Sequence, residues 1–411
     1  MSAPPSCSPH LVTVSGQDGP GIAERLFAGL CARGVGIDDV EQVRVHGRLL
    51  LCVEVALAPG DADALRDALA PSFGDAGVDV TVARLIESEG AAAQGADAGA
   101  AAGEHQIVTV LAPEVDAATL QGLTGRVAAS GGNIERIVRL AAYPVHSYEL
   151  IVAGADLDAL RRGLAEEAAR RRVDVAVQAA GLHRRAKHLI VLDADSTLLQ
   201  GEVIDLLAAR CGCAAEVAAV TEAAMAGELD FEEALRRRVR LLAGLKERDL
   251  EAVRDAMELA PGARTLVRTL RRLGYELAVV SGGFVQVIAE LVAGLGIDHL
   301  AANELEVDSG VVTGELAGPI VDRAGKAAAL TRFAEAAGVP LSRTIAVGDG
   351  ANDIDMLAAA GLGIAFNAKP VVRQAADTAL SVPYLDAILF LLGISRREVE
   401  LADRLDEVAT P

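Results

Sequence analysis

The stretch VGDGANDIDM, residues 347–356, decides the fold class of this chain. Its acidic residues follow an apolar run, residues 344–347, that is typical of a buried strand. Similar apolar runs occur elsewhere in the same part of the chain, at residues 188–192, 276–280 and 362–365. Because predicted helices separate these runs, the pattern predicts an α/β fold with a parallel sheet and helices on both of its faces.

Polar, glycine-containing turns follow the predicted strands, and ligands of open α/β folds bind beyond the carboxyl ends of strands. The first strand ends in LDADSTL, residues 192–198, in which Asp193 and Asp195 are two positions apart. The second ends in VSGGF, residues 280–284, and Lys326 lies near the start of a later predicted helix. Singly, these features also fit an Asx turn, a glycine turn and a solvated surface lysine. Together they predict one site.

In this order, the segments resemble the haloacid dehalogenase superfamily of phosphoryl-transfer enzymes. The resemblance covers residues 187–392 and implies a Rossmann-like parallel sheet with an inserted helical cap. Members of this family usually have a bulkier residue in the place of Ala194. That departure removes no functional group from the predicted site.

The resemblance gives each polar residue of these segments a role. It implies that Asp193 attacks phosphorus to form an aspartyl phosphate and that Asp195 acts as the general acid and base. It also implies Mg²⁺, held by Asp193, the backbone carbonyl of Asp195 and Asp349, since hard oxygen ligands suit this ion. Asp353 would orient the lysine among the residues that bind the phosphoryl group, which are Ser281, Gly282, Lys326 and Asn352.

Residues 200–277 are far more numerous than a simple crossover helix between the first two strands needs. The helical stretches predicted there would form the cap, at about residues 202–260, and lie at residues 202–209, 214–226, 231–243 and 248–258. A cap of this kind excludes water and selects the substrate.

Two segments of the predicted cap, GEVID and MAGELDF followed by LRRRV, resemble the phosphoserine phosphatase family. The resemblance implies that Glu202 binds the substrate ammonium, that Arg238 binds its carboxylate, and that Met225 and Phe231 line the pocket. One anion and one guanidinium fork are the groups that a zwitterionic amino acid requires. The arginines beside Arg238 also fit an ordinary solvated helix face.

The implied reaction converts O-phospho-L-serine and water to L-serine and phosphate, the last step of serine biosynthesis. Two alternatives stay open at this point. One is a phosphatase of the same superfamily that acts on another small phosphomonoester, and the other is an amino-acid-sensing protein whose phosphatase domain is only a scaffold. The complete set of Asp193, Asp195, Lys326 and Asp349 argues against the scaffold.

The N-terminal part repeats the order strand, helix, strand, strand, helix, strand in residues 8–86 and again in residues 105–181. Residues 87–104 between the copies are rich in Gly and Ala and are predicted to be a flexible linker. The phosphatase-like domain is predicted at residues 186–396, with a C-terminal tail at residues 397–411.

Each copy resembles the ACT domain, a small module that often binds amino acids. In the first copy, the turn SGQDGPGI would present backbone N–H groups to a ligand carboxylate through Gly16, Asp18, Gly19 and Gly21. The second copy has no glycine in the corresponding turn, residues 112–116, and departs from the pattern. The resemblance implies an amino-acid effector and a homodimer, and the alternative is a structural ferredoxin-like pair.

The chain has 411 residues, of which 38 are basic and 58 are acidic, and its net charge is −20. This acidity disfavours non-specific binding to nucleic acid or anionic membranes, and no apolar run is long enough for a membrane span. The five scattered cysteines show no disulfide framework and no CxxC pair, which predicts a reduced, cytoplasmic protein.

Overall fold

A computed structural model describes residues 7–74, 76–85, 105–181, 184 and 186–409 of the chain. The chain divides into two compact units, residues 1–102 and residues 103–411. The predicted linker at residues 87–104 lies outside the described residues. None of the described helices combines the length and the apolar composition that a membrane span needs.

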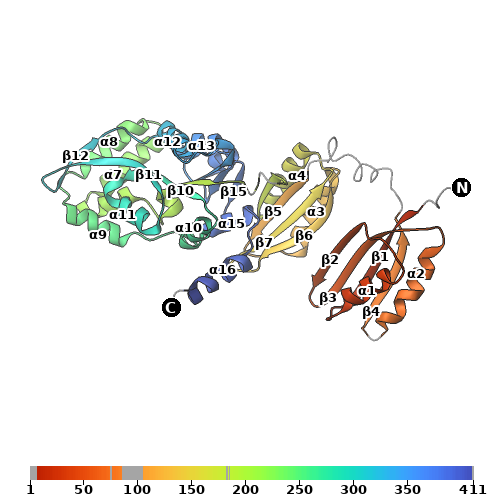
Figure 1. The fold of residues 1–411 in the computed structure, drawn as a ribbon. Coiled ribbons are helices and arrows are strands. Elements are labelled where there is room, and N and C mark those ends of the chain that lie inside the picture. The colour runs from red at the N-terminus through yellow and green to blue at the C-terminus, as the bar shows by residue number, and fades with distance from the viewer. Residues whose placement is uncertain (1–6, 75, 86–104, 182–183, 185, 410–411) are drawn as a thin grey trace. The chain divides into compact units, whose positions relative to one another are not determined.

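The first unit is a four-stranded antiparallel sheet with two helices (Figure 1). Its strand order is β2-β3-β1-β4. The helices cover one face of the sheet, where Leu26 and Leu69 pack against Val12 and Val53. The elements are β1 (Ser8–Gln17), α1 (Ile22–Cys31), β2 (Asp39–Val45), β3 (Arg48–Leu57), α2 (Asp61–Leu69) and β4 (Val78–Arg84).

The second unit begins with a domain of the same design, whose sheet has the order β6-β7-β5-β8. Leu123 and Leu160 from its two helices lie in one buried cluster with Val108 and Val110 of β5, one of the two inner strands. The elements are β5 (Gln106–Ala112), α3 (Ala117–Ala129), β6 (Asn133–Ala141), β7 (His146–Ala153), α4 (Leu157–Arg171) and β8 (Asp174–Ala179). The predicted repeat of strand, helix, strand, strand, helix, strand is therefore confirmed.

The rest of the second unit is built on a seven-stranded sheet of order β12-β11-β10-β9-β13-β14-β15. Its strands are parallel except for β12, which runs antiparallel to β11. The strands are β9 (Leu189–Asp193), β10 (Glu276–Phe284), β11 (His299–Asp308), β12 (Val311–Ala317), β13 (Thr344–Gly348), β14 (Gly363–Phe366) and β15 (Thr378–Leu380).

Helices cover both faces of this sheet, and four more form the inserted cap (Figure 1). The cap helices are α6 (Val203–Cys211), α7 (Ala214–Met225), α8 (Phe231–Leu241) and α9 (Glu247–Ala256). The others are α10 (Ala263–Arg272), α11 (Val285–Leu295), α12 (Arg323–Ala336), α13 (Ile354–Ala359), α14 (Pro370–Ala375), α15 (Ile388–Leu391) and α16 (Arg396–Ala409).

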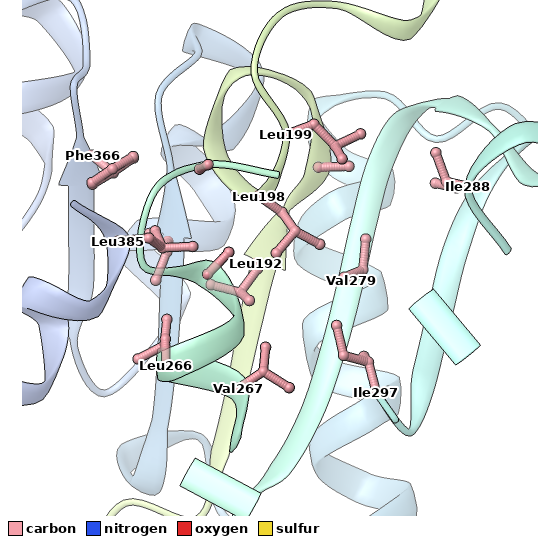
Figure 2. Close-up of a cluster of buried hydrophobic side chains, with 14 of the residues drawn as sticks. Leu192, Leu198, Leu199, Leu266, Val267, Val279, Ile288, Ile297, Phe366 and Leu385 are labelled. Atoms are coloured by element: carbon pink, nitrogen blue, oxygen red, sulfur yellow. The ribbon is translucent and has the colours of Figure 1, made fainter. Parts of the chain in front are cut away.

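Alternate residues of the central strand β9 enter different cores. Leu192 packs in the cluster that includes Leu266 and Val279 (Figure 2), whereas Val191 packs on the opposite face against Leu330 of α12. A strand buried on both faces has to be apolar along its whole length, as in all-parallel sheets. The polar residues of this region therefore lie at the ends of the strands, where the candidate site is found.

Three features of the fold differ from what the sequence pattern predicts. The first is the hairpin of β11 and β12, which adds an antiparallel strand at the edge of the sheet. Its turn at Ser309 and Gly310 has residues that are usual in hairpin turns, so the sequence did contain a signal for it. The predicted tail forms most of helix α16, and Asp403 in it is ion-paired with Arg268 and Arg272 of α10.

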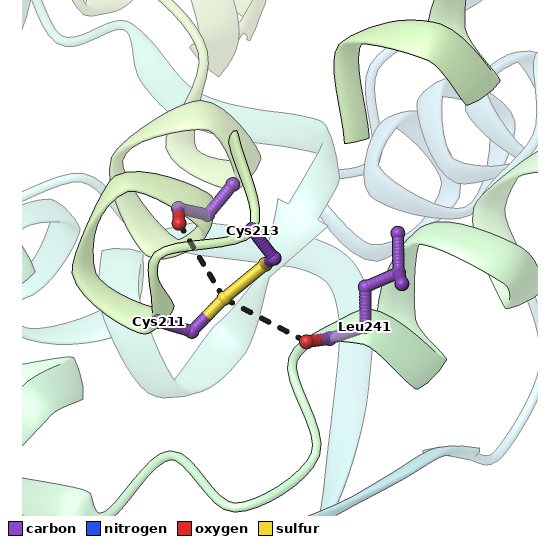
Figure 3. The surroundings of a disulfide bond; sticks show 4 residues. Cys211, Cys213 and Leu241 are labelled. Carbon is purple, nitrogen blue, oxygen red and sulfur yellow. Dashed lines mark hydrogen bonds between the residues drawn. A yellow bond between two sulfur atoms is a disulfide. The ribbon is translucent and has the colours of Figure 1, made fainter. Parts of the chain in front are cut away.

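The third unanticipated feature is a disulfide bond between Cys211 and Cys213 in the cap (Figure 3). The sulfur of Cys211 lies 3.6 Å from the carbonyl oxygen of Leu241 in α8. The prediction concerned a disulfide framework, and one bond between cysteines two positions apart, where the chain passes from α6 to α7, was not foreseen by it.

Candidate active site

The site begins at the carboxyl ends of β9, β10 and β13, which are adjacent in the sheet. Asp193 is the last residue of β9 and pairs in register with Val280 of β10. Leu192 pairs with Val347 of β13, so Asp349 follows the neighbouring strand end. The parallel order of these strands therefore gathers acidic residues that are 156 positions apart in the sequence (349 − 193).

Lys326 is the centre of the site, and its side chain is completely buried. Its Nζ lies 2.7 Å from Oδ1 of Asp193 and 2.7 Å from Oδ1 of Asp353. Burial alone would lower the pKa of Lys326, but the two carboxylates together outweigh burial and raise it. The lysine therefore stays charged, and the predicted role of Asp353 as its partner agrees with this geometry.

Asp353 is held by a turn with almost no free space. Its Oδ2 accepts a hydrogen bond from the backbone N–H of Gly350 at 2.9 Å. A Cβ atom at Gly348 would lie 2.4 Å from the carboxylate carbon of Asp353. Glycine is thus required in VGDG so that the carboxylate can reach Lys326.

Asp193 and Asp195 are both buried, but they have different partners. Oδ1 of Asp193 also accepts a hydrogen bond from the backbone N–H of Ala194 at 2.8 Å. The two oxygens of Asp195 accept hydrogen bonds from Val203 N at 2.8 Å and from the hydroxyl of Ser281 at 3.1 Å. Burial raises the pKa of both carboxyl groups, and Lys326 opposes this increase. A raised pKa suits Asp195 for proton transfer.

A metal ion fits between the acidic residues of this cluster. Carboxylate oxygens of Asp193, Asp349 and Asp353 all lie within 4.8 Å of one another. Both oxygens of Asp353 are engaged, Oδ1 by Lys326 and Oδ2 by the backbone N–H of Gly350. The contacts of Asp193 with Lys326 and Ala194 N both fall on Oδ1, which favours Asp193 and Asp349 as the carboxylate ligands. Burial raises the pKa of Asp349 to about 6, and the neighbouring Asp353 adds to this effect. Oxygen donors and a need for positive charge agree with a hard divalent ion.

The cap brings two charged side chains to the same region. Glu202 immediately precedes α6, and Ser196 Oγ donates to its Oε1 at 3.3 Å. Desolvation by the surrounding protein raises the pKa of Glu202 to about 7, and the charges of Asp195 and Asp349 add to this effect. An added positive charge would therefore be favourable here.

The arginines of α8 do not share one environment. Arg236 and Arg237 lie on a solvated face and pair with Glu232 and Glu233 of the same helix, as the sequence alternative predicted. Arg238 is half-buried, and burial lowers its pKa although the charge of Glu202 acts in the opposite direction. Arg238 is therefore near the acidic site and lacks an acidic ion-pair partner among the described residues.

Phe231 is the first residue of α8, and its ring lies close to Gly282 near the carboxyl end of β10. A Cβ atom built at Gly282 would lie 3.9 Å from Cζ of Phe231. The ring therefore covers the predicted phosphate loop from the cap side. Met225 ends α7, but its side chain is outside the described part of the structure. Asn352 follows the VGDG segment and lies in the 3₁₀ turn of residues 351–353, next to Asp353.

Comparisons with known proteins show which families the chain resembles. A family model for haloacid dehalogenase-like hydrolases matches residues 190–358. Two models for ACT domains match residues 8–83 and 104–178. The phosphoserine phosphatase of Streptomyces coelicolor is 52% identical over 399 residues, which cover 96% of this chain and 94% of that protein. Phosphoserine phosphatase SerB2 of Mycobacterium tuberculosis is 50% identical over 405 residues and covers 96% of each chain.

The chain belongs to the phosphoserine phosphatase family. Solved structures confirm its architecture. A haloacid dehalogenase family hydrolase from Salmonella enterica has a TM-score of 0.62 and 29% identity, and covers 70% of this chain and 98% of that one. A probable phosphoserine phosphatase from Vibrio cholerae has a TM-score of 0.57 and 31% identity, and covers 72% and 88%. The predicted fold, with its two ACT domains, is thereby confirmed.

Sequence reasoning missed two residues that position this phosphoserine phosphatase site. Thr197 donates a hydrogen bond from Oγ1 to Oδ1 of Asp349 at 3.2 Å, and it lies within the LDADSTL motif already singled out. Asn303 is buried in β11, donates to the carbonyl of Gly282 and accepts from Val321 N, both at 2.8 Å. The sequence indicates a special role for Asn303 only through the presence of a polar amide in a run that is otherwise typical of a strand.

Two glycines of the predicted ligand turn in the first ACT domain have backbone environments that require glycine. Gly21 precedes α1 with a φ of 85°, a conformation that favours glycine. A Cβ at Gly16 would lie 2.4 Å from the carbonyl oxygen of Gly77. The side chain of Asp18 is paired with Arg44 at 2.6 Å, and its backbone N–H donates to the carbonyl of Gly47 at 2.8 Å, so Asp18 is already engaged within the domain.

Replacing Lys326 by Met should destabilise the phosphatase domain by about 3 to 5 kcal/mol, because two buried carboxylates lose their counter-ion. The loss should be smaller at pH 5 than at pH 8. Burial already raises the pKa of Asp193, and without the lysine this carboxyl group takes up a proton more readily as the pH falls. Urea unfolding followed by circular dichroism measures both effects.

Lys369→Met is the matched control for this prediction, since Lys369 is exposed. It should change the free energy of unfolding by less than about 0.5 kcal/mol. An unfolding free energy of Lys326→Met equal to that of the control at both pH values would contradict the proposed dependence on the buried lysine.

Proposed function

We propose that this protein hydrolyses O-phospho-L-serine to L-serine and phosphate. The observation that carries the proposal is the combination of the carboxylate cluster around Lys326 with Glu202 and Arg238 at the cap side of the same site. The first part provides phosphoryl-transfer chemistry, and the second matches the ammonium and carboxylate of an amino acid. The curated relatives in Streptomyces coelicolor and Mycobacterium tuberculosis carry the name phosphoserine phosphatase.

In the proposed mechanism, one carboxylate oxygen of Asp193 attacks phosphorus while the ester oxygen of the serine leaves. Lys326, through Nζ, neutralises Asp193 and the incoming phosphoryl oxygens. Asp193, Asp349 and the backbone carbonyl of Asp195 would hold Mg²⁺. When bound, that ion supplies positive charge to the phosphoryl oxygens.

Asp195 would supply both proton transfers. In its protonated form it donates a proton to the leaving serine oxygen, and afterwards it removes a proton from the water that attacks the aspartyl phosphate. Its hydrogen bonds with Val203 N and the Ser281 hydroxyl fix its orientation for both steps. Ser281, Gly282 and Asn352 would bind the phosphoryl oxygens, with Asn303 holding the Gly282 turn in place.

Recognition of the serine part would come from the cap. Glu202 would bind the ammonium, Arg238 the carboxylate, and Phe231 and Met225 would line the remaining surface. A phosphomonoester without these two charged groups would leave Arg238 and Glu202 desolvated without a partner, which is unfavourable. This contrast favours phosphoserine over other small phosphomonoesters.

The ACT domains would serve regulation or assembly. An amino-acid effector at the turn of Gly16, Asp18, Gly19 and Gly21, a homodimer formed through ACT domains, and a cytoplasmic location remain predictions. The high net acidity supports the absence of nucleic acid and membrane partners. A purely scaffolding phosphatase domain is disfavoured, because the buried charges around Lys326 have a clear use only in chemistry.

Phosphate release from O-phospho-L-serine should require Mg²⁺ and stop on addition of EDTA.

Arg238→Leu should raise the KM for phosphoserine at least tenfold and change kcat less, because the substrate carboxylate loses its partner. Arg237→Leu, which removes a solvated arginine from the same helix, is the control and should keep both constants within twofold. Unchanged phosphoserine kinetics in Arg238→Leu would contradict the substrate assignment.

Glu202 gives a second, pH-dependent prediction. Its raised pKa of about 7 means that it gains a proton, and loses its attraction for an ammonium, as the pH falls from 8 to 6. The KM for phosphoserine should therefore rise roughly tenfold relative to that for 3-phosphoglycerate, which has a hydroxyl in place of the ammonium. The phosphate group titrates in a similar way in both substrates, so the ratio of their KM values reports on recognition of the ammonium.

The comparison is made by measuring phosphate release at saturating Mg²⁺ across this pH range. In Glu202→Gln the ratio of the two KM values should no longer vary with pH. A ratio that varies equally in wild type and in Glu202→Gln would show that another group recognises the ammonium.

A further inference from the structure

The second ACT domain and the phosphatase domain meet at a seam between β8 and β15. Each of these strands is at the edge of its own sheet. Asp174 of β8 joins them, since one oxygen accepts a hydrogen bond from Ser381 N at 2.5 Å and the other lies 3.8 Å from Arg373 of α14. The two sheet edges are therefore covered by each other and joined through this side chain.

Further contacts fix the seam. Arg184 forms an ion pair with Glu149 of β7 at 2.6 Å and donates to the carbonyl of Leu391 at 3.0 Å. The side-chain amide of Gln178 donates to the same carbonyl at 2.9 Å. The relation between the two domains is thus set by specific polar contacts, and a cavity along the seam has defined walls.

A cavity of about 410 Å³ lies along this seam. α4 and β8 of the ACT domain form one wall, and α14 and β15 of the phosphatase domain form the other. The volume is in the range of small-molecule sites, which also occur preferentially between domains. The apolar part of its lining is entirely aliphatic and includes Leu164, Val173, Val175, Val177, Ala376 and Ala379.

The polar part of the lining carries two positive and two negative side chains. Arg161 and Arg373 come from opposite walls, and so do Asp174 and Asp377. Within the described ranges, Arg161 forms no ion pair or hydrogen bond with protein. The Oγ1 atom of Thr378, another lining residue, is buried and without a hydrogen-bond partner in the same ranges.

These charges select a particular class of ligand. Arg161 is exposed at the rim, whereas the carboxylate of Asp174 is buried, so a simple anion bound at Arg161 would approach the like charges of Asp174 and Asp377. A zwitterion satisfies both signs at once, and the aliphatic lining suits an aliphatic side chain. We infer that this seam cavity is a binding site for an aliphatic α-amino acid, separate from the turn at residues 15–22 of the first ACT domain.

The position of the cavity connects it to the active site. α14, which carries Arg373, packs against α13 and against the 3₁₀ turn of residues 351–353. That turn carries Asn352 and Asp353, the partner of Lys326. A ligand that draws Arg373 toward Arg161 therefore acts on an element directly packed against the catalytic turn, and it changes turnover if it prefers one position of α14.

Calorimetric titration of the full chain with L-valine tests the site. We expect binding to wild type and at least tenfold weaker binding to Arg161→Leu, with an intermediate effect in Arg161→Lys. Arg162→Leu, a neighbouring exposed arginine on the same helix outside the cavity lining, should bind as wild type does. Isobutylamine and 3-methylbutanoate, which each lack one charge of valine, should bind at least tenfold more weakly.

Arg238→Leu distinguishes the seam from the active site, and L-valine should bind this variant as it binds wild type. Absence of binding to wild type at millimolar L-valine would overturn the inference. Binding that is lost in Arg238→Leu and retained in Arg161→Leu would place the ligand in the active site and also overturn it.

Turnover provides a separate test of the connection to the active site. L-valine should change kcat for phosphate release at least twofold in wild type and in Arg162→Leu, but not in Arg161→Leu. Binding at the seam with an unchanged kcat would support the site and refute its action through α14.

Discussion

The amine of Lys326, enclosed between Asp193 and Asp353, is the interaction on which the rest of the active site depends. All three side chains are buried, and carboxylates without this cation would carry a large desolvation cost. The lysine therefore reduces this cost for an acidic cluster at the ends of the two adjacent strands β9 and β13. The tight VGDG turn, the start of α12 and the register of β9 with β13 all serve to bring these three groups together.

The net charge of −20 has a related explanation. Several acidic residues belong to the cluster that surrounds Lys326 and a proposed metal ion, so local charge at the site differs from the charge of the whole chain. Beyond about 8 Å, salt screens the global field. A dianionic phosphate can therefore bind where a positive charge is in contact with it, in a protein whose surface repels nucleic acid.

The fold and the centre of the site could be predicted because their signals are local. Asp193, Asp195, Ser281 and Asp349 each follow an apolar strand, and adjacent parallel strands bring their ends together. Other features depend on contacts between distant segments. Nothing in the run of arginines distinguishes Arg238 from Arg237 until α8 is packed over the site, and the role of Asn303 appears only when Gly282 and Val321 are next to it. The seam cavity likewise requires two domains to be placed together.

The most direct test of the proposed mechanism is to identify the residue that carries the phosphoryl group during turnover. Acid quenching of the reaction with O-phospho-L-serine, followed by proteolysis and mass spectrometry, should find a phosphoryl group on Asp193 and none in Asp193→Asn. Phosphorylation at another residue, or full phosphate release by Asp193→Asn in the presence of Mg²⁺, would contradict the proposal that Lys326 and its carboxylates prepare Asp193 as the nucleophile.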